Sequence, residues 1–226
     1  MMFPKEKFNI GNKEEKKDLK SQSEGFLSGQ ENEKVEILSA KENDIEGILK
    51  IQQEHLLKNV STDTEKKDGF LLFETAAETL KEIIEEEKII ISKVDDDLAG
   101  YLILMTPEKL KKSDFYALFL ENIKNFKYKD KQLDNYNYIV YAQAAVSKKY
   151  QGMGLNRKMQ KEAKERFINY YDLGIGEINT KNEASLKVNI DRLGWKPVGI
   201  YKDPKGEEWC VTIDDFKEEK EKEKKE

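Results

Sequence analysis

A glycine-containing loop is the part of this sequence whose residue types and spacing could do chemistry. It follows an apolar run at 138–146 and precedes an amphipathic helical pattern, and its residues 151–156 are QGMGLN. Glycine lets a backbone come close to a ligand, and the N–H groups at a helix N-terminus attract anions. The loop therefore predicts a phosphate or pyrophosphate site, although an ordinary strand-to-helix turn would have the same pattern.

Two common nucleotide-binding motifs do not fit this loop. A P-loop needs the string G-x-x-x-x-G-K-[ST], which the sequence lacks. A Rossmann fingerprint needs a third glycine where Arg157 stands, and an acidic residue at the end of the next strand. Asp172 comes before that strand instead, so both motifs are excluded.

The loop instead resembles the Q/R-x-x-G-x-G/A acetyl-CoA signature of the GNAT superfamily, the acetyl-CoA-dependent N-acetyltransferases. The preceding strand residues Ala144-Ala145-Val146, and Tyr150 directly before the loop, match the usual lead-in of that signature. Downstream, Asn182 to Trp195 is similar to the family's segment in which an Asn opens a helix and Leu-Gly-aromatic ends it. The resemblance extends from Val35 to about Ile213.

This resemblance implies an enzyme that transfers an acetyl group from acetyl-CoA, its co-substrate, to an amine by direct attack in a ternary complex. The strand backbone would pair with the pantetheine arm, the loop N–H groups would hold the pyrophosphate, and the residues after the next strand would lie near the thiol end. The acetyl-CoA-binding residues that it implies are Ala144, Ala145, Val146, Gln151, Gly152, Met153, Gly154, Leu155, Asn156, Asn182 and, less directly, Ser185.

The sequence departs from the family pattern at two positions. Asn156 stands where the loop usually ends in Gly or Ala. Many family members carry a Tyr as general acid four residues before the glycine of Leu-Gly-aromatic, where this chain has Ile190 beside Asn189. Neither side chain can give up a proton at neutral pH. Another group must therefore protonate the leaving thiolate, or hydrogen bonds alone must stabilise it.

The catalytic residues are not assigned by the sequence. His55 is the single histidine and is interpreted as a surface or boundary residue in preference to a general base. Glu74, Glu78 and Tyr141 are alternatives that no spacing singles out. Cys210 has no partner base nearby in the sequence and is interpreted as a small buried residue.

Composition excludes several classes of protein. With 45 acidic and 40 basic residues, the net charge of −5 argues against binding to nucleic acid. One cysteine and one histidine exclude a disulfide framework and the usual zinc and iron–sulfur sites, so no metal is expected. No apolar run is long enough to span a bilayer, and the N-terminus lacks a secretory h-region. We expect a cytoplasmic protein without a membrane partner, and leave its oligomeric state open, a dimer included.

Strand and helix patterns alternate along the chain, which predicts the α/β (α+β) class with a mixed, mostly antiparallel central sheet flanked by helices. Thr75 and Glu78 have the spacing of a helix capping box, and Thr106-Pro107 is a helix start. The expected strands are 35–38, 88–93, 98–105, 138–146, 174–180, 199–201 and 209–213, and the expected helices begin at 44, 75, 106, about 155 and 182. The third of these helical stretches is expected to continue to about 126.

Charged segments at both ends surround the predicted domain. We expect a polar, flexible N-terminal extension at 1–33, a single GNAT-like domain at 34–216, and a Lys/Glu-rich tail at 217–226. Two alternatives to the enzyme stay open: a GNAT-like acyl-CoA-binding module with little or no turnover, and an interaction protein that works through its charged ends.

Overall fold

The computed structural model describes residues 33–61 and 69–218 of the 226-residue chain. The chain separates into two units, Met1–Lys34 and Val35–Glu226, and all the helices and strands named below belong to the second. Apart from Glu33, the predicted N-terminal extension lies outside the described residues. The predicted domain limits, 34–216, stay a prediction.

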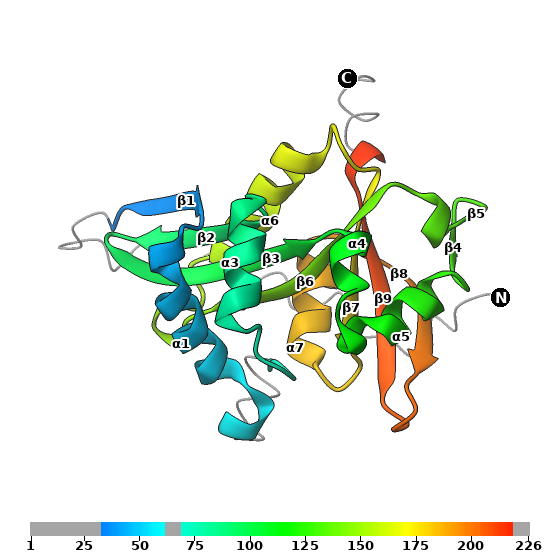
Figure 1. Cartoon of the computed structure of the whole chain (residues 1–226), viewed down its shortest axis with the longest axis horizontal. Helices are drawn as coiled ribbons and strands as arrows, with labels where there is room; N and C mark the ends of the chain where they lie inside the picture. The colour runs from blue at the N-terminus through cyan, green and yellow to red at the C-terminus, as the bar shows by residue number, and fades with distance from the viewer. Residues whose placement is uncertain (1–32, 62–68, 219–226) are drawn as a thin grey trace, which may run out of the picture. The chain divides into compact units, whose positions relative to one another are not determined.

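A seven-stranded sheet forms the centre of the second unit (Figure 1). Neighbouring strands pair antiparallel, except for β6 and β7, which pair parallel. In their order across the sheet, the strands are β1 (Val35–Ser39), β2 (Ile89–Val94), β3 (Asp97–Met105), β6 (Tyr138–Val146), β7 (Leu173–Asn179), β9 (Glu208–Asp215) and β8 (Lys196–Lys202). A separate short hairpin consists of β4 (Lys127–Tyr128) and β5 (Lys131–Gln132).

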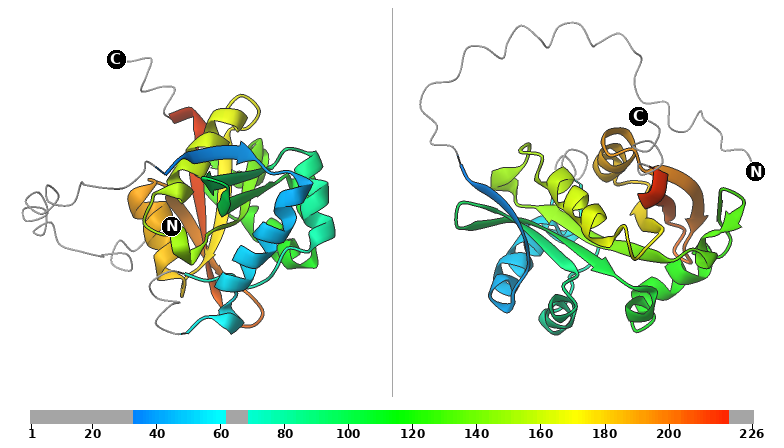
Figure 2. Two further views of the ribbon diagram at one scale, coloured as in Figure 1. Left: turned by 90° about the vertical axis from the view of Figure 1, so that its left-hand side faces the viewer. Right: turned by 90° about the horizontal axis from the view of Figure 1, so that it is seen from above.

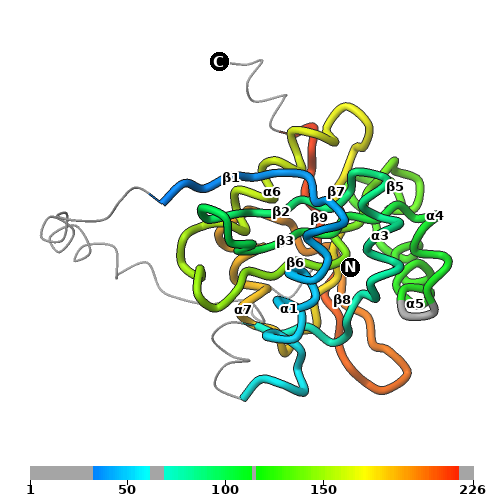
Figure 3. The backbone as a smooth tube through the Cα atoms, turned by 60° about the vertical axis from the view of Figure 1, so that its left-hand side comes forward, coloured from blue at the N-terminus to red at the C-terminus, as the bar shows by residue number. Residues whose placement is uncertain are grey.

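Helices cover both faces of this sheet (Figure 2). One face carries α1 (Ile45–His55), α3 (Ala77–Glu85), α4 (Pro107–Leu110) and α5 (Asp114–Ile123). The other carries α6 (Leu155–Phe167) and α7 (Glu183–Leu186), which continues as π-helical turns at Lys187–Arg192. The segment between β3 and β6, which contains α4, α5 and the β4–β5 hairpin, lies together at one end of the sheet (Figures 1 and 3).

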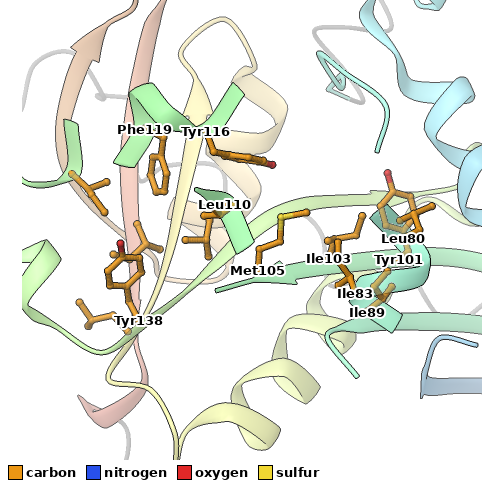
Figure 4. Packing of buried hydrophobic residues seen from close by; sticks show 14 of the residues in the cluster. Leu80, Ile83, Ile89, Tyr101, Ile103, Met105, Leu110, Tyr116, Phe119 and Tyr138 are labelled. Carbon is orange, nitrogen blue, oxygen red and sulfur yellow. The ribbon is translucent and has the colours of Figure 1, made fainter. Parts of the chain in front are cut away.

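The larger hydrophobic core lies between the sheet and the helices α1, α3, α4 and α5 (Figure 4). Strand residues of one parity, such as Ile89, Tyr101 and Ile103, meet helix residues such as Leu80 and Phe119, and all five are fully buried. Alternate strand residues share a face of the sheet, which explains why these apolar runs fill one side of it.

A smaller core lies under α6 and depends on two glycines of β7. The rings of Tyr141 and Trp195 pack edge to face with centroids 4.7 Å apart. A Cβ atom at Gly174 would lie 2.3 Å from the Tyr141 ring, and one at Gly176 would lie 2.8 Å from Trp195. Only glycine therefore lets both rings lie directly against β7.

The predicted class, a mixed and mostly antiparallel α/β sheet, is confirmed, and β6 has the predicted bounds. The Thr106 start is also confirmed, because its hydroxyl accepts a hydrogen bond from the Lys109 N–H at 3.3 Å. The long helical stretch to residue 126 is wrong. The chain breaks it into α4 and α5, and residues 127–132 form the small hairpin.

The capping box at Thr75 is also wrong. The N-cap of α3 is Ala76, and no side chain caps this helix. Thr75 is buried, and its backbone N–H donates to Gln52 Oε1 at 2.6 Å. Thr75 therefore links α1 to the segment before α3 and does not cap α3.

Gly174→Ala should lower the free energy of unfolding by about 1–3 kcal/mol, the usual cost of overpacking a core, because the new methyl would overlap the Tyr141 ring. Urea unfolding measures this loss of stability. Lys161→Ala, on the exposed side of α6, is the control, and its free energy of unfolding should stay within about 0.5 kcal/mol of wild type. Equal stability of the two variants would contradict the packing described for β7.

Candidate functional site

The strands β6 and β7 part soon after they meet. Their parallel pairing covers three pairs and ends at Val140 opposite Ile175, although β6 continues to Val146 and β7 to Asn179. Within the described residues, the second half of β6 pairs with β3 alone. We call residues 141–146 the open edge of β6. Ala142 and residues 144–146 are only half-buried, which is unusual for the middle strand of a seven-stranded sheet.

The open edge presents backbone groups toward β7. The Ser147 N–H donates to the Ala99 carbonyl of β3 at 2.8 Å. In an antiparallel ladder, alternate residues direct their backbone groups to the same neighbour. The backbone N–H and C=O groups of Ala145, two residues before Ser147, therefore point to β3. Those of Ala144 and Val146 point to the open side.

The two loop glycines have backbone conformations that favour glycine. Gly152 has φ +85° and Gly154 has φ +71°, and a Cβ at either position would have no atom within 4 Å. Gly154 is also the N-cap residue of α6. The loop thus leaves open space directly at the N-terminus of a 13-residue helix, where N–H groups point outward.

Buried side chains fix the loop to the β2–β3 hairpin, and cationic side chains lie on its exposed surface. Tyr150 and Leu155 are buried in a small cluster with Val94 and Ala99 of the β2–β3 hairpin. The Tyr150 hydroxyl donates to Asp97, which also pairs with Lys149 at 2.7 Å. Further exposed cationic side chains around the loop are Lys148, Arg157 and Lys158. The geometry and the charge both suit an anion.

The predicted residues Asn182 and Ser185 lie at the start of α7. Asn182 is buried and caps the helix, because its Oδ1 accepts from the Ser185 N–H at 3.2 Å. Its Nδ2 donates to the Phe70 carbonyl at 3.0 Å. Asn182 therefore fixes the start of α7 against the segment that precedes α3.

A chain of amides connects α7 to α6. Asn189 Nδ2 donates to the carbonyl of Ser185 at 2.9 Å and to its hydroxyl oxygen at 3.2 Å. Gln160 Nε2 donates to Asn189 Oδ1 at 3.1 Å and to Asn156 Oδ1 at 3.3 Å. Because a carbonyl can only accept, the bond to Ser185 fixes the orientation of both amides. Gln160 Oε1 is left as a buried acceptor without a partner among the described residues.

A carboxyl group lies on the other face of the sheet beside the open edge. Glu177 is two residues beyond Ile175, the last β7 residue paired with β6, and shares its face. That face carries α5, from which the Tyr116 hydroxyl donates to the Ala142 carbonyl at 3.2 Å. Tyr201 of β8 donates its hydroxyl to Glu177.

The surroundings of Glu177 favour its neutral form. Burial raises the pKa of Glu177 to about 7, and the hydrogen bond from Tyr201 opposes this rise. Burial and then the charge of Glu177 raise the pKa of both Tyr116 and Tyr201. Glu177 is thus a carboxyl whose charge changes near neutral pH, with a hydrogen bond from Tyr201, and its charge acts on Tyr116, which stays protonated.

His55 is buried, whereas the sequence predicted a surface or boundary residue. It is 4% exposed, and its Nε2 lies 2.9 Å from the Val146 carbonyl. Since a carbonyl oxygen only accepts, Nε2 must carry the proton of this bond. That nitrogen holds the end of the open edge and is not free to remove a proton.

The other residues singled out by the sequence have different surroundings. Glu74 and Glu78 are exposed, and Glu74 accepts a hydrogen bond from Gln53. Tyr141 is buried under α6, on the face opposite Glu177. Cys210 is fully buried, and burial raises the pKa of its thiol to about 11, which agrees with the prediction of a small buried residue.

Glu177 was not among the residues predicted from the sequence, although a signal for it is present there. The strand reads Leu173-Gly174-Ile175-Gly176-Glu177, and its odd positions face the larger core. A carboxylate at a core-facing position of a strand is costly unless its charge is removed or paired. The alternation along this strand is therefore enough to single out Glu177.

Neither a metal cluster nor a membrane-spanning helix is found in the part of the chain that the structure describes. The described residues contain no group of three or more His, Cys, Asp or Glu side chains that could hold a metal ion. Among the helices formed by residues 33–61 and 69–218, none is long and apolar enough to cross a membrane.

Comparisons with known proteins identify the fold. No protein-family model matches the sequence, and no curated protein matches it. Solved structures do match. Ard1 from Thermoplasma volcanium is 11% identical, covers 80% of this chain and 97% of its own, and has a TM-score of 0.55. A GNAT-family acetyltransferase from Listeria monocytogenes is 15% identical over 80% of this chain and 94% of its own, with a TM-score of 0.54.

A third structure adds a ligand. The protein yncA from Salmonella typhimurium, solved with its cofactor acetyl-CoA, is 14% identical over 81% of this chain and 95% of its own, with a TM-score of 0.53. At these identities the likeness concerns the fold. The chain has the GNAT superfamily fold, as its sequence resemblance implied.

The pKa of Glu177 should make stability depend on pH. Between the ordinary carboxyl pKa of 4.5 and about 7, the folded protein holds a proton that the unfolded chain releases. The contribution of Glu177 to the free energy of unfolding should therefore fall as pH rises through this window. Glu177→Gln removes the titration and should be more stable, relative to wild type, at pH 8 than at pH 5.

Urea unfolding at both pH values measures this difference. Glu165→Gln, an exposed glutamate on α6, is the matched control and should keep the wild-type dependence. A parallel pH dependence of Glu177→Gln and wild type would show that Glu177 is already ionised in the folded protein at pH 5.

Proposed function

We propose that this protein is an N-acetyltransferase that transfers an acetyl group from acetyl-CoA to an amine by direct attack in a ternary complex. The observation that carries the proposal is the open edge of β6 directly before the glycine loop. An unpaired strand edge binds extended, amide-bearing chains, and a glycine loop at a helix N-terminus binds phosphate groups. Acetyl-CoA contains both chemical features in one molecule.

The residues present fit acetyl-CoA. The loop from Gln151 to Asn156 offers backbone N–H groups to the pyrophosphate, with open space at both glycines. Ala144 offers its N–H and C=O groups, and Val146 its N–H group, to the amides of the pantetheine arm, while the Val146 carbonyl already accepts from His55. Asn156, where the family has Gly or Ala, accepts from Gln160 and leaves the loop backbone in place. Acetyl-CoA supplies the activated thioester, and the fold shared with yncA, which was solved with acetyl-CoA, supports this choice.

The leaving thiolate is stabilised by hydrogen bonds. Asn189 donates to the Ser185 hydroxyl oxygen, so the proton of that hydroxyl must point to another acceptor. Ser185 lies in the first turn of α7, and Gln160 of α6 holds Asn189. We assign to Ser185 a hydrogen bond to the departing sulfur. This hydrogen bond takes the place of the general acid that a tyrosine provides in many family members, at the position where this chain has Ile190.

The second candidate is an acyl-CoA-binding module with little or no turnover. Ile190 favours it, because an ionisable side chain at that position is missing. Both candidates need the loop and the open edge, so binding alone does not separate them. Turnover does.

Acetyl-CoA should raise the melting temperature of the full chain, because a ligand that binds the folded state alone stabilises it. With a panel of primary amines, including small amines and peptide N-termini, free thiol should appear in proportion to the acetylated amine. A thiol assay together with mass measurement of the products detects both. A thermal shift without thiol release would identify the binding module, and no shift with acetyl-CoA or CoA at millimolar concentration would refute both candidates.

Gly154→Val should weaken acetyl-CoA binding about tenfold or more, since a β-branched residue at φ +71° costs about 1–2 kcal/mol and fills the space at the loop. Gly206→Val is the matched control. Gly206 has φ +84° and open space around it as well, but it lies in the β8–β9 turn. Calorimetric titration should show wild-type affinity for the control, and an equal loss in both variants would contradict the loop as the binding site.

A further inference from the structure

We propose that a cleft between α4, α5 and the start of β6 is a binding site for a small organic ammonium ion, separate from the open edge. The cleft has a volume of about 620 Å³ and is lined by residues from 106–111, 117–124 and 134–138, together with Tyr171. We call it the α5 cleft. Ligand sites in proteins usually have volumes of about 300–1,000 Å³, so this cleft has room for a small molecule.

The α5 cleft lies at the opposite end of β6 from the glycine loop. Tyr138 begins β6, and the pairing of this strand with β7 covers residues 138–140. Ala142 of the open edge lies about 13 Å farther along the strand, at about 3.3 Å per residue. The segment between β3 and β6, which supplies most of the cleft, lies together at one end of the sheet (Figures 1 and 3). A ligand in the cleft would therefore not occupy the open edge.

A buried tyrosine in the cleft has a hydroxyl group without a partner. Tyr138 is 7% exposed, and its ring packs in the larger core together with Leu110 and Phe119 (Figure 4). Its hydroxyl forms no hydrogen bond to any of the described residues, whereas those of Tyr116 and Tyr136 both donate to carbonyl groups. A buried polar group without a partner costs free energy, which a ligand that reaches this hydroxyl would recover. Because a phenol both donates and accepts, the surrounding charges decide which ligand it suits.

The charges that act on this hydroxyl are negative. Glu108 of α4 and Asp134, just before β6, both line the cleft. Burial, and then the charges of these two carboxylates, raise the pKa of Tyr138 to about 12. Glu108 also raises the pKa of Tyr171, again after burial. Neither Glu108 nor Asp134 forms an ion pair within the part of the chain that the structure describes. Both carboxylates are therefore available to a cationic ligand.

Two lysines also line the cleft but do not cancel this negative charge. Lys111 and Lys124 are exposed, and neither acts on the pKa of Tyr138 or Tyr171. Their charge is thus not felt at the two hydroxyls, where that of the carboxylates is. With Glu121, the lining has three carboxylates against two ammonium groups. The part of the cleft beside the tyrosines therefore favours a cation.

Aromatic rings make the cleft suitable for a cation with an apolar body. Tyr136, Tyr138 and Tyr171 all line it, and ring faces attract ammonium groups. Tyr136 already has such a contact within the chain, because the ammonium group of Lys131 lies 4.4 Å from its ring centroid. Leu120 adds apolar surface. An amine with a short aromatic body matches these groups, with its N–H donors directed to the Tyr138 hydroxyl oxygen and the carboxylates.

The test uses 2-phenylethylamine, with 2-phenylethanol and 3-phenylpropionate as the neutral and anionic comparators. Calorimetric titration of the full chain without acetyl-CoA should show the amine binding at millimolar concentration, about fivefold or more tighter than either comparator. Added salt should weaken the binding of the amine, because its ammonium group meets exposed carboxylates. Equal binding of the alcohol and the amine would refute a cation site, and so would an absence of binding.

Three variants test the residues of the cleft. Glu108→Gln and Asp134→Asn should each weaken amine binding about threefold, as the loss of a partly exposed charge pair does. Tyr138→Phe, which removes the hydroxyl alone, should weaken it about threefold or more. Glu165→Gln is the matched control, because it makes the same change on α6, outside the cleft. The melting temperature without amine checks that each variant is folded, and wild-type affinity in all three cleft variants would refute the site.

NMR locates the bound amine independently of affinity. Backbone amide signals of residues 108–111 and 134–138 should shift on titration, and those of residues 141–156 should not. Shifts confined to residues 141–156 would mean that the amine binds at the open edge, and would refute the cleft as its site. None of these outcomes depends on acetyl transfer, which thiol release tests separately.

Discussion

The early parting of β6 and β7 is the constraint on which the site depends. Two parallel strands in the middle of a sheet are normally hydrogen-bonded to a neighbour along both edges of each strand, and both of their faces are covered. Here three pairs join the two halves of the sheet, and among the described residues no strand pairs with β6 on that side beyond them, directly before the glycine loop. The register between β6 and β3 also shifts at this point, because Tyr141 pairs with Leu104 and Gln143 with Ile103, which leaves Ala142 as the extra residue of a bulge. The Tyr141–Trp195 ring pair lies against Gly174 and Gly176 of β7.

The sequence predicted the strand β6 and the start of α6, because each is specified by residues close to it in the chain. The strand at 138–146 is an apolar run bounded by polar residues, and its ends match the structure. Gly152 and Gly154 have the positive φ values that a phosphate-binding turn requires, and Gly154 begins α6 as the pattern indicated. Since each signal lies within a few residues of the element it specifies, no tertiary contact was needed to interpret it.

The features that the sequence did not predict depend on contacts between distant segments. Thr75 has the spacing of a cap, but Gln52, 23 residues earlier, binds its backbone. His55 was interpreted from its helix alone, whereas Val146, 91 residues later, gives it a buried acceptor. The surroundings of Glu177 combine β7, α5 and β8, and only the fold brings them together. Such properties follow from topology and not from periodicity.

The two faces of the open edge differ in the kind of polar chemistry they hold. On the α6 side, Ser185, Asn189, Gln160 and Asn156 form a chain of amide and hydroxyl groups, none of which ionises near neutral pH. The opposite face holds Glu177, whose charge changes there. Gln160 Oε1 is a buried acceptor without a partner among the described residues, and such a group costs about 1–3 kcal/mol unless a donor reaches it. The polar groups on the α6 side therefore keep one charge state at any moderate pH, whereas the opposite face changes its charge through Glu177.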